Sequence, residues 1–423
     1  MKKVLIIAYY WPPAGGPGVQ RWLKFITYLR DFNVEPILYI PKNPHYPIQD
    51  TSLLKEVPEG ITIYRQSIFE PYALASMLSS KKTKRISSGL IRTKKQSVVE
   101  KMFLWIRGNL FIPDARKFWV KPSIKFLEGV LEKENIKTII TTGPPHSVHL
   151  IGLGLKKKLD ISWVSDFRDP WTSIGYHKKL KLTTGSKRKH KQLEREVLNA
   201  ADKIIVTSAT TKEEFGLITK QPIEVITNGY DTSISNAEDL DKDFTLAHIG
   251  SLLTGRDPSG LWQSLSELVE ENEQFKIHFK LQLVGVVSDD VLKNIAKHGL
   301  IPNTEIVGYL THEKAVSFQR KSQILLLIEI DSDETKGIIP GKLFEYMAAG
   351  RPILGIGPKN WEVAQLIEET NTGKAFLYSN KEALKGVILK WFNLYLKRNL
   401  KNTSESIEKY SRKALTEQLA KHL

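Results

Sequence analysis

The sequence predicts an α/β protein of two domains, each built on a parallel β-sheet. Two observations carry this prediction. At 423 residues, the chain exceeds the usual size of a single hydrophobic core, so two domains of about 200 residues each are expected. Short apolar runs also alternate with amphipathic stretches of helix length, which is the pattern of βαβ units with helices on both faces of a parallel sheet.

The predicted strands are the apolar runs themselves. In the first domain they span residues 4–8, 35–40, 61–64, 138–141, 163–165 and 203–207, and in the second 245–249, 280–284, 304–307, 324–328 and 352–356. A polar, turn-rich stretch at 227–241 separates the two sets and is interpreted as a linker. The predicted domains are therefore 1–235 and 236–404, followed by an amphipathic helical segment at 405–423. Residues 42–122 interrupt the alternation and are too long for an ordinary loop, so they predict an elaboration of the first domain.

The composition narrows the class of protein. The chain has no cysteine, which excludes disulfides and thiolate metal sites. The apolar run that starts at Val4 is interrupted by Trp11, Pro12 and Pro13, so it is too short for a signal peptide. No apolar stretch approaches the roughly 20 residues that a spanning helix needs. These features favour a cytoplasmic protein.

The net charge of +16 raises the question of an anionic partner. Basic residues concentrate at 81–85, at 92–95 and at 178–191, without interleaved aromatics or a known nucleic-acid motif, so no nucleic-acid partner is expected. Together with the apolar run 102–106, they favour attraction to the anionic inner face of a membrane, worth about 1 kcal/mol per basic residue. A solvated basic face is the alternative.

The segment 336–355 joins a glycine-rich turn, a lysine, a helix and an apolar strand. Gly337 lets the backbone approach a ligand, and a helix starting near Pro340 directs its free N–H groups at an anion. Lys342 adds a positive charge, and Glu345, one turn further, is placed to accept hydrogen bonds from ribose hydroxyls. The segment therefore predicts a nucleotide site, with a solvated helix N-terminus as the alternative.

Polar and glycine residues also follow predicted strands of the first domain, where parallel sheets bind ligands. Gly15 and Gly16 precede a helix and leave the backbone open to a diphosphate or sugar, or simply form a tight connection. The other candidates are two carboxylates that could orient a hydroxyl or accept its proton, an arginine between them, and a histidine that could bind a sugar: Asp166, Asp169, Arg168 and His146. Asp166 is slightly preferred because it is nearer the strand end. A salt-bridged loop and a packed or capping histidine are the alternatives.

Four segments resemble the retaining nucleotide-sugar glycosyltransferases of the GT-B fold, which have two facing Rossmann-like domains with parallel sheets and a cleft between them. The most specific is Lys342-Leu-Phe-Glu-Tyr-Met-Ala-Ala-Gly-Arg-Pro352, which is similar to the family's donor-binding element. The opening strand with its Gly-Gly loop at 3–18 and the donor-domain loop at 248–256 also match. The segment 163–171 is similar to one found in bacterial surface-polysaccharide members.

The resemblance implies roles for residues of the second domain. Arg256 and Lys342 would neutralise the diphosphate, so that no metal or other cofactor is needed, and Glu345 would bind the ribose. Gly250 and Ser251 would form the first donor loop, while Gly285 and Tyr309 would line the base pocket. Many relatives carry a second glutamate eight residues before the first, but this chain has Gly337 there. The sugar would then meet the backbone of Gly337, Ile338 and Ile339. Asp331-Ser-Asp333 is the one near match to a metal motif, and no metal role is assigned to it.

The resulting prediction is a glycosyltransferase that moves a sugar from a nucleoside-diphosphate sugar to a hydroxyl of a surface glycan or lipid-linked acceptor, with retention. The elaboration at 42–122 would shape the acceptor side. Two alternatives stay open: a nucleotide-sugar epimerase of the same fold, and a catalytically silent nucleotide-binding or scaffold protein.

Overall fold

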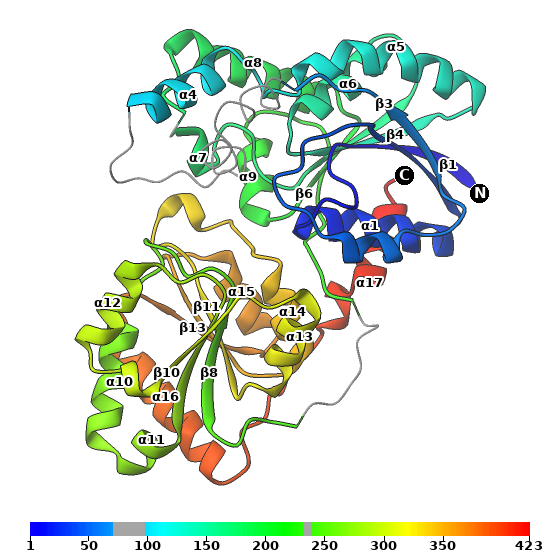
Figure 1. The fold of residues 1–423 in the computed structure, drawn as a ribbon. Helices are drawn as coiled ribbons and strands as arrows, with labels where there is room; N and C mark the ends of the chain where they lie inside the picture. Colours follow the sequence, from blue (N-terminus) through cyan, green and yellow to red (C-terminus); the bar gives the residue numbers. More distant parts are fainter. Residues whose placement is uncertain (71–97, 179, 232–238) are drawn as a thin grey trace. The chain divides into compact units, whose positions relative to one another are not determined.

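The computed structural model describes residues 1–70, 98–178, 180–231 and 239–423 (Figure 1). These residues form two compact units: unit 1 comprises Met1–Asn228 and Arg412–Leu423, and unit 2 comprises Gly229–Ser411. The predicted boundary at residue 235 lies outside the described residues, while the observed division falls at Asn228, within the turn-rich stretch. Near the C-terminus, the chain returns to unit 1 at Arg412, compared with the predicted residue 405.

Unit 1 is built on a seven-stranded sheet in the order β3-β2-β1-β4-β5-β6-β7, and each neighbouring pair is parallel. The strand order reverses between β1 and β4, so the loops that follow these two strands diverge to opposite faces of the sheet. The strands are β1 (Lys2–Ala8), β2 (Val34–Pro41), β3 (Thr62–Gln66), β4 (Thr138–Gly143), β5 (Ser162–Phe167), β6 (Lys203–Val206) and β7 (Ile223–Val225).

The helices of unit 1 cover both faces of this sheet. Figure 1 shows α5, α6 and α8 on one side and α1 with α17 on the other. The α-helices are α1 (Pro17–Leu29), α4 (Val98–Asn109), α5 (Lys117–Lys133), α6 (Ser147–Lys156), α7 (Gly175–Lys178), α8 (Thr184–Ala200), α9 (Ala209–Gly216) and α17 (Arg412–Ala420), with 3-10 turns at Arg30–Phe32 and Thr51–Glu56.

Helix α1 shows why these residues form a helix at this place. Pro17 occupies a position near the helix start, where its missing N–H costs nothing, and Gly16 at the N-cap has a φ of 111° that favours glycine. The buried side chains of α1 recur at helical spacing and face the sheet: Val19, Trp22, Leu23, Phe25, Ile26 and Leu29.

The C-terminal helix α17 belongs to unit 1 and packs on α1. Leu415 and Leu419 are buried in the unit 1 core. At the edge of this contact, Arg412 Nη2 donates a hydrogen bond to Gln20 Oε1 at 3.1 Å. The last residues of the chain therefore complete the core formed by the first ones.

Unit 2 contains a six-stranded sheet in the order β10-β9-β8-β11-β12-β13, again with parallel neighbours. Here the order reverses between β8 and β11. The strands are β8 (Phe244–Ile249), β9 (Phe279–Val284), β10 (Thr304–Gly308), β11 (Ile324–Ile328), β12 (Ile353–Gly357) and β13 (Gly373–Leu377). The α-helices are α10 (Ser259–Glu271), α11 (Glu273–His278), α12 (Asp289–Lys297), α13 (His312–Lys321), α14 (Lys342–Ala349), α15 (Glu362–Glu369) and α16 (Lys381–Leu396), and 3-10 turns lie at Ile301–Asn303, Asp333–Thr335 and Glu408–Tyr410.

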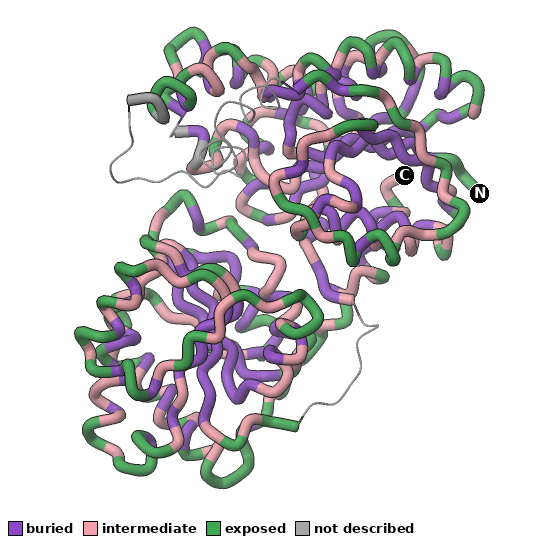
Figure 2. Tube along the Cα trace, viewed as in Figure 1, coloured by how far each residue is buried: buried purple, intermediate pink, exposed green. Residues whose placement is uncertain are grey.

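The central strands of unit 2 are buried on both faces. Along β11, Ile324, Leu326 and Ile328 belong to one core cluster, while Leu325 and Leu327 belong to another. Successive side chains of a strand point to opposite faces, so helices must cover both sides of this sheet. Figure 2 shows the corresponding buried interior of each unit.

Two strands of the structure were not predicted from the sequence, namely β7 and β13. Both lie at sheet edges. β7 has three residues, and β13 has no buried residue. Short or partly exposed edge strands lack the continuous apolar run on which the prediction depended.

The elaboration predicted at 42–122 is described except for residues 71–97. A buried polar cluster ties part of it to the end of β1: Tyr9 Oη donates to Glu70 Oε1 at 2.7 Å, and Arg116 Nε lies 3.1 Å from the same oxygen. The backbone N–H of His45 donates to the other carboxylate oxygen. These contacts fix the loop after β2 beside the loop after β1. Among the described residues, no helix has both the length and the apolar character needed to cross a bilayer.

Candidate functional site

The strand order places one candidate site in each unit, at the carboxyl ends of the strands where the order reverses. In unit 2, this is the edge formed by the loops after β8 and β11. In unit 1, it is the edge formed by the loops after β1 and β4. Most residues singled out in the sequence lie on these loops or directly beside them.

Three strand-end loops of unit 2 meet through their backbones. Gly250 N donates to Val284 O at 2.8 Å, and Gly285 N donates to Gly308 O at 2.7 Å. A Cβ at Gly285 would lie 2.7 Å from Gly250 O, and both residues have positive φ angles, so both positions require glycine. Together they form a glycine floor after β8 and β9 that holds no side chain.

Lys342 lies beside this floor as the first residue of α14. Its Nζ donates to Ile249 O at 3.3 Å, and a Cβ at Gly250 would lie 3.4 Å from Nζ. Burial, followed by the charge of Arg256, lowers the pKa of Lys342 to about 8, and the charges of Glu329 and Glu345 oppose this shift. The predicted helix start near Pro340 thus differs by two residues from the observed start at Lys342.

Arg256 lies in the loop after β8 and forms an ion pair with Glu329. Its Nε and Nη2 donate to Glu329 Oε1 at 3.1 and 2.8 Å. Glu329 is only 2% exposed and follows β11 directly. Sequence reasoning missed Glu329, although a carboxylate immediately after the apolar run 324–328 was an available signal.

Glu345 lies one turn into α14, where Gln319 Nε2 donates to its Oε2 at 3.0 Å. Gln319 is buried and comes from α13. Because this bond fixes one carboxylate oxygen, Gln319 orients Glu345. Sequence reasoning missed this residue too, since a glutamine within a helix gives no signal of its own.

The remaining unit 2 candidates differ in exposure. Tyr309 is 85% exposed on the loop after β10, and Ser251 is exposed beside Gly250. In the turn before α14, Ile338 is exposed and its carbonyl accepts from Trp361 Nε1 at 3.4 Å, while Ile339 is packed in the core. The side chain of Ile339 therefore faces inward, while the side chain of Ile338 is exposed.

In unit 1, Asp166 is fully buried at the end of β5 and accepts three hydrogen bonds. The donors are Trp22 Nε1 at 2.8 Å, Thr142 Oγ1 at 2.8 Å and Arg21 Nη2 at 3.2 Å. With no exposed surface, this carboxylate cannot contact a substrate in this conformation. The structure therefore corrects the preference for Asp166: it links α1, β4 and β5.

Arg21 connects Asp166 to residues near the end of the segment Met1–Asn228. Its guanidinium donates to Ile226 O at 2.9 Å and also to Thr227 O, and it lies 4.6 Å over the ring of Phe25. Burial lowers the pKa of Arg21, and the carboxylate of Asp166 opposes this effect. The pair is a structural ion pair of the unit 1 core.

Asp169 differs from Asp166 in its exposure and in its hydrogen bonds. It is partly exposed and makes no hydrogen bond within the described residues. Burial raises its pKa, and the charge of Arg168 lowers it. Asp169 is thus the carboxylate of this loop that is available to a ligand.

Arg168 lies against the glycine loop that precedes α1. It donates from Nε to Gly143 O at 3.2 Å and from Nη2 to Pro144 O. A Cβ at Gly18 would collide with its Nη1, so glycine there makes room for the guanidinium. Gly15 N is held by Ile48 O at 3.1 Å, and Gly16 caps α1. The loops after β1 and β5 therefore meet, and Arg168 contributes positive charge at the helix N-terminus.

His146 is a packed side chain. It is buried, and its ring stacks on Trp171 with the centroids 4.9 Å apart. Burial lowers its pKa well below the usual value, so the ring is neutral. Neither ring nitrogen has a hydrogen-bond partner within the described residues. This position agrees with the packed alternative that the sequence left open.

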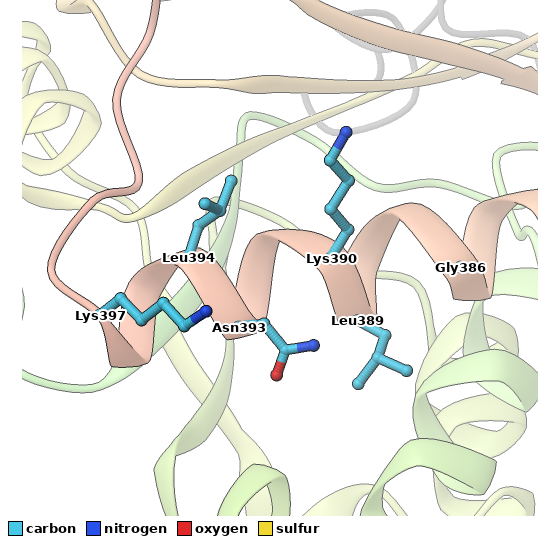
Figure 3. Close-up of a pocket in the computed structure, with 6 residues that line it drawn as sticks. All are labelled: Gly386, Leu389, Lys390, Asn393, Leu394 and Lys397. Carbon is cyan, nitrogen blue, oxygen red and sulfur yellow. The ribbon is translucent and has the colours of Figure 1, made fainter.

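Within the described residues, neither a metal cluster nor the pocket along α16 adds to the candidate sites. Within the described residues, no group of three or more His, Asp or Glu side chains is arranged to hold a metal ion. Asp333 opens a 3-10 turn capped by Ser332. A pocket of about 360 Å³ lies along α16, and its lining residues are Gly386, Leu389, Lys390, Asn393, Leu394 and Lys397 (Figure 3). None of these residues comes from a strand-end loop, so the pocket is separate from the candidate sites.

Comparison with known proteins supports the fold and gives a family match over part of the chain. Residues 96–234 match the family model Glycosyltransferase Family 4. A glycosyltransferase from Rickettsia africae ESF-5 is 13% identical with a TM-score of 0.61, covering 100% of this chain and 97% of its own. WaaG, a glycosyltransferase involved in lipopolysaccharide biosynthesis, is 13% identical with a TM-score of 0.56, covering 99% of both chains.

A third structure is described as another kind of enzyme. A protein of Listeria monocytogenes described as a UDP-N-acetylglucosamine 2-epimerase is 15% identical with a TM-score of 0.55, covering 99% of this chain and 95% of its own. No curated protein matches the sequence significantly. The comparisons confirm the resemblance to GT-B glycosyltransferases and the GT-B fold with its two Rossmann-like units.

The two aspartates of the 163–171 segment are expected to behave differently on substitution. Asp166→Asn leaves the buried Arg21 guanidinium without its counter-ion, so it should lower the free energy of unfolding by about 3–5 kcal/mol. Asp169→Asn removes a charge that burial disfavours and should change stability by less than about 0.5 kcal/mol. Urea unfolding of the full chain measures both. Equal losses, or a larger loss for Asp169→Asn, would contradict this distinction.

Proposed function

From the GT-B fold and the Glycosyltransferase Family 4 match, we propose that this protein transfers a sugar from a nucleoside-diphosphate sugar to a hydroxyl of a surface glycan or lipid-linked acceptor. The observation that carries the proposal is the pair of cations, Arg256 and Lys342, beside the glycine floor of unit 2. The class of acceptor is supported by the likeness to WaaG, and the class of donor by the likeness to an enzyme named for a UDP-sugar.

The donor would bind along the strand-end loops of unit 2. Its diphosphate would lie over Gly250 and Gly285, where no side chain intervenes, within reach of Arg256 and Lys342. Glu345, oriented by Gln319, would accept hydrogen bonds from the ribose hydroxyls. Tyr309 offers an exposed ring for the base, and the backbone from Gly337 to Ile339 would meet the sugar.

The cations would act on the leaving group. When the bond from the anomeric carbon to the diphosphate breaks, the diphosphate departs with the bonding electrons and its negative charge grows. Arg256 and Lys342 are fixed in place beforehand, so they stabilise this charge more in the transition state than in the ground state. We propose that this removes the need for a metal.

Acceptor activation would involve unit 1. We propose that Asp169, the partly exposed carboxylate beside Arg168, would orient an acceptor hydroxyl. The hydroxyl oxygen would bond to the anomeric carbon, and its proton would pass to the departing phosphate oxygen. This route forms the new bond on the face that the leaving group vacates and would give retention.

Two other functions have specific support. An epimerase is favoured by the Listeria likeness and by the raised pKa of Asp169, since a carboxylate that binds a proton more tightly is a better base. A catalytically silent protein is favoured by the glycine at position 337, where many relatives have a glutamate.

We also propose that the protein works at the anionic inner face of the cytoplasmic membrane. On unit 1, an aromatic patch is formed by Phe69, Phe111 and Phe118, with the ring centroids of Phe69 and Phe118 5.7 Å apart. Lys117 Nζ lies 5.3 Å from the centre of the Phe118 ring. Three further apolar side chains are exposed on α4, and lysines lie on α4 and α5: Met102, Phe103, Trp105, Lys101, Lys121 and Lys125. Exposed apolar and basic side chains together fit an anionic lipid surface.

Some of the basic residues that favour attraction to the membrane lie outside the part of the chain that the structure describes. The predicted basic clusters at 81–85 and 92–95 are outside the described residues. In the third cluster, Lys187, Arg188, Lys189 and Lys191 are exposed on α8, where a solvated basic face is the alternative.

Incubation with donor alone should separate the proposed functions. With uridine and guanosine diphosphate sugars but no acceptor, a glycosyltransferase yields no new nucleotide sugar, whereas an epimerase does. Adding lipid-linked or glycan acceptors should release the nucleoside diphosphate, and a chelator should leave this rate unchanged if no metal acts. Chromatography of the nucleotides measures both steps. A new nucleotide sugar from donor alone would overturn the transferase assignment, and the absence of nucleoside diphosphate binding would favour the silent alternative.

Removing either cation should weaken nucleotide binding. Arg256→Ala and Lys342→Ala are each expected to raise the dissociation constant for a nucleoside diphosphate by about 10- to 100-fold, because each loses a charge-assisted hydrogen bond. Turnover should fall by at least as much. Lys390→Ala on the outer side of α16 serves as the matched control and should change neither value. Titration calorimetry measures the affinities, and unaltered binding in both variants would remove the leaving-group site from unit 2.

Membrane attraction should depend on lipid charge and on the aromatic surface. The protein is expected to sediment with vesicles containing about 30% phosphatidylglycerol and less with neutral vesicles, with binding falling as salt rises. The double variant Trp105→Ser/Phe118→Ser should bind more weakly. Leu217→Ser is the control, since Leu217 is 91% exposed on unit 1 but lies at the end of α9. Equal binding to neutral and anionic vesicles would contradict the proposal.

A further inference from the structure

Glu329 is a buried carboxylate that the sequence did not single out. It follows β11, one of the two strands between which the order of the unit 2 sheet reverses. Its backbone is fixed on both sides: Glu329 N donates to Ile356 O at 2.9 Å, and Glu329 O accepts from Tyr378 Oη at 2.7 Å. The carboxylate therefore emerges from a rigid position at the edge where the donor would bind.

The contacts of Glu329 hold only one edge of Arg256. Both Nε and Nη2 of Arg256 donate to Glu329 Oε1, which also accepts from Ile330 N at 2.7 Å. Nη1 of Arg256 has no hydrogen-bond partner within the described residues, and the side chain is 31% exposed. A guanidinium held along one edge keeps its remaining N–H groups directed outward, in the geometry that recognises phosphate oxygens.

Glu329 also offsets the positive charge near Lys342. Arg256 and Lys342 act on each other electrostatically, and Glu329 acts on Lys342 with the opposite sign. Without the charge of Glu329, the repulsion between the two cations would be stronger before any diphosphate arrived. With an exposure of 2%, Glu329 is too deep to replace the glutamate that is missing at Gly337 as a sugar ligand.

We propose that Glu329 is a positioning residue for the diphosphate: it holds Arg256 with its Nη1 edge outward and offsets the repulsion between Arg256 and Lys342. This inference rests on the proposed function. The chemistry suits the diphosphate part of the donor, because the outward guanidinium edge and the lysine offer two cationic donors beside a backbone floor.

The surroundings of Lys342 predict a pH signature for this role. The charged groups that act on it are Arg256 from the β8 loop, Glu329 from the end of β11 and Glu345 from α14. His248 from β8 is also close, but burial lowers its pKa well below the usual value, so it is neutral. Removing the charge of Glu329 should lower the pKa of Lys342 below its value of about 8. Lys342 would then lose its proton at a lower pH. Without that proton it would no longer offer a positive charge to the diphosphate.

The test is titration calorimetry of UDP and GDP with the full-length protein between about pH 6.5 and 9. Wild-type affinity should fall as pH rises through the pKa of Lys342. Glu329→Gln should weaken binding by about 10-fold at neutral pH and move this fall to lower pH. Glu267→Gln is the matched control: this unit 2 carboxylate pairs with Lys381 and Lys385 instead, and its loss should leave affinity and pH profile unchanged.

A double-mutant cycle separates positioning from a general loss of structure. If Glu329 acts through Arg256, Glu329→Gln should weaken binding less in an Arg256→Ala background than in the wild type. Glu329→Asp provides a second variant that keeps the charge but withdraws it from Arg256; it should keep more of the wild-type pH profile than Glu329→Gln. Thermal unfolding identifies any variant that is not folded.

The outcomes are distinguishable. Unchanged affinity and pH profile in Glu329→Gln, or strictly additive losses in the cycle, would overturn the positioning role while leaving the proposed function intact. A wild-type protein that binds neither UDP nor GDP would overturn both.

Discussion

The reversal of strand order in each parallel sheet is the constraint on which the sites depend. Because β8 and β11 send their following loops to opposite faces of the unit 2 sheet, a crevice is expected at their carboxyl ends. Gly250 and Arg256 lie on one of these loops, and Glu329 begins the other. In unit 1, next to the reversal between β1 and β4, Arg168 from the loop after β5 lies against Gly18 at the start of α1. Side chains that are distant in sequence therefore meet near the point where the strand order reverses.

Each unit contains an arginine–carboxylate pair near the carboxyl ends of its strands. The two pairs differ in how much of the arginine side chain stays exposed. In unit 1, Asp166 takes hydrogen bonds from three side chains and Arg21 is also bonded to two carbonyls, so the pair is enclosed. In unit 2, Glu329 holds one edge of Arg256 and the other edge stays exposed. An enclosed ion pair can only fix the fold, whereas a half-open pair can also receive an anion.

The sequence predicted the elements whose signal is local. Central strands such as β11 have continuous apolar runs because both faces are buried, and these were predicted nearly to the residue. The edge strands β7 and β13 lack that signal and were missed. In the candidate site, Lys342 and Glu345 were found because they share one helix with a glycine-rich turn. Glu329 and Gln319 were missed because their importance lies in a contact with a distant residue. The choice between Asp166 and Asp169 likewise depended on burial, which a strand-end position does not determine.

The central claim is that unit 2 binds a nucleoside diphosphate through Arg256, Lys342 and the glycine floor. The most direct measurement is a crystal structure of the protein with UDP or GDP bound. We expect phosphate oxygens within hydrogen-bond distance of Arg256 Nη1 and Lys342 Nζ, with the ribose at Glu345. A nucleotide bound elsewhere, with the Arg256–Glu329 pair and the glycine floor contacting no phosphate, would contradict it.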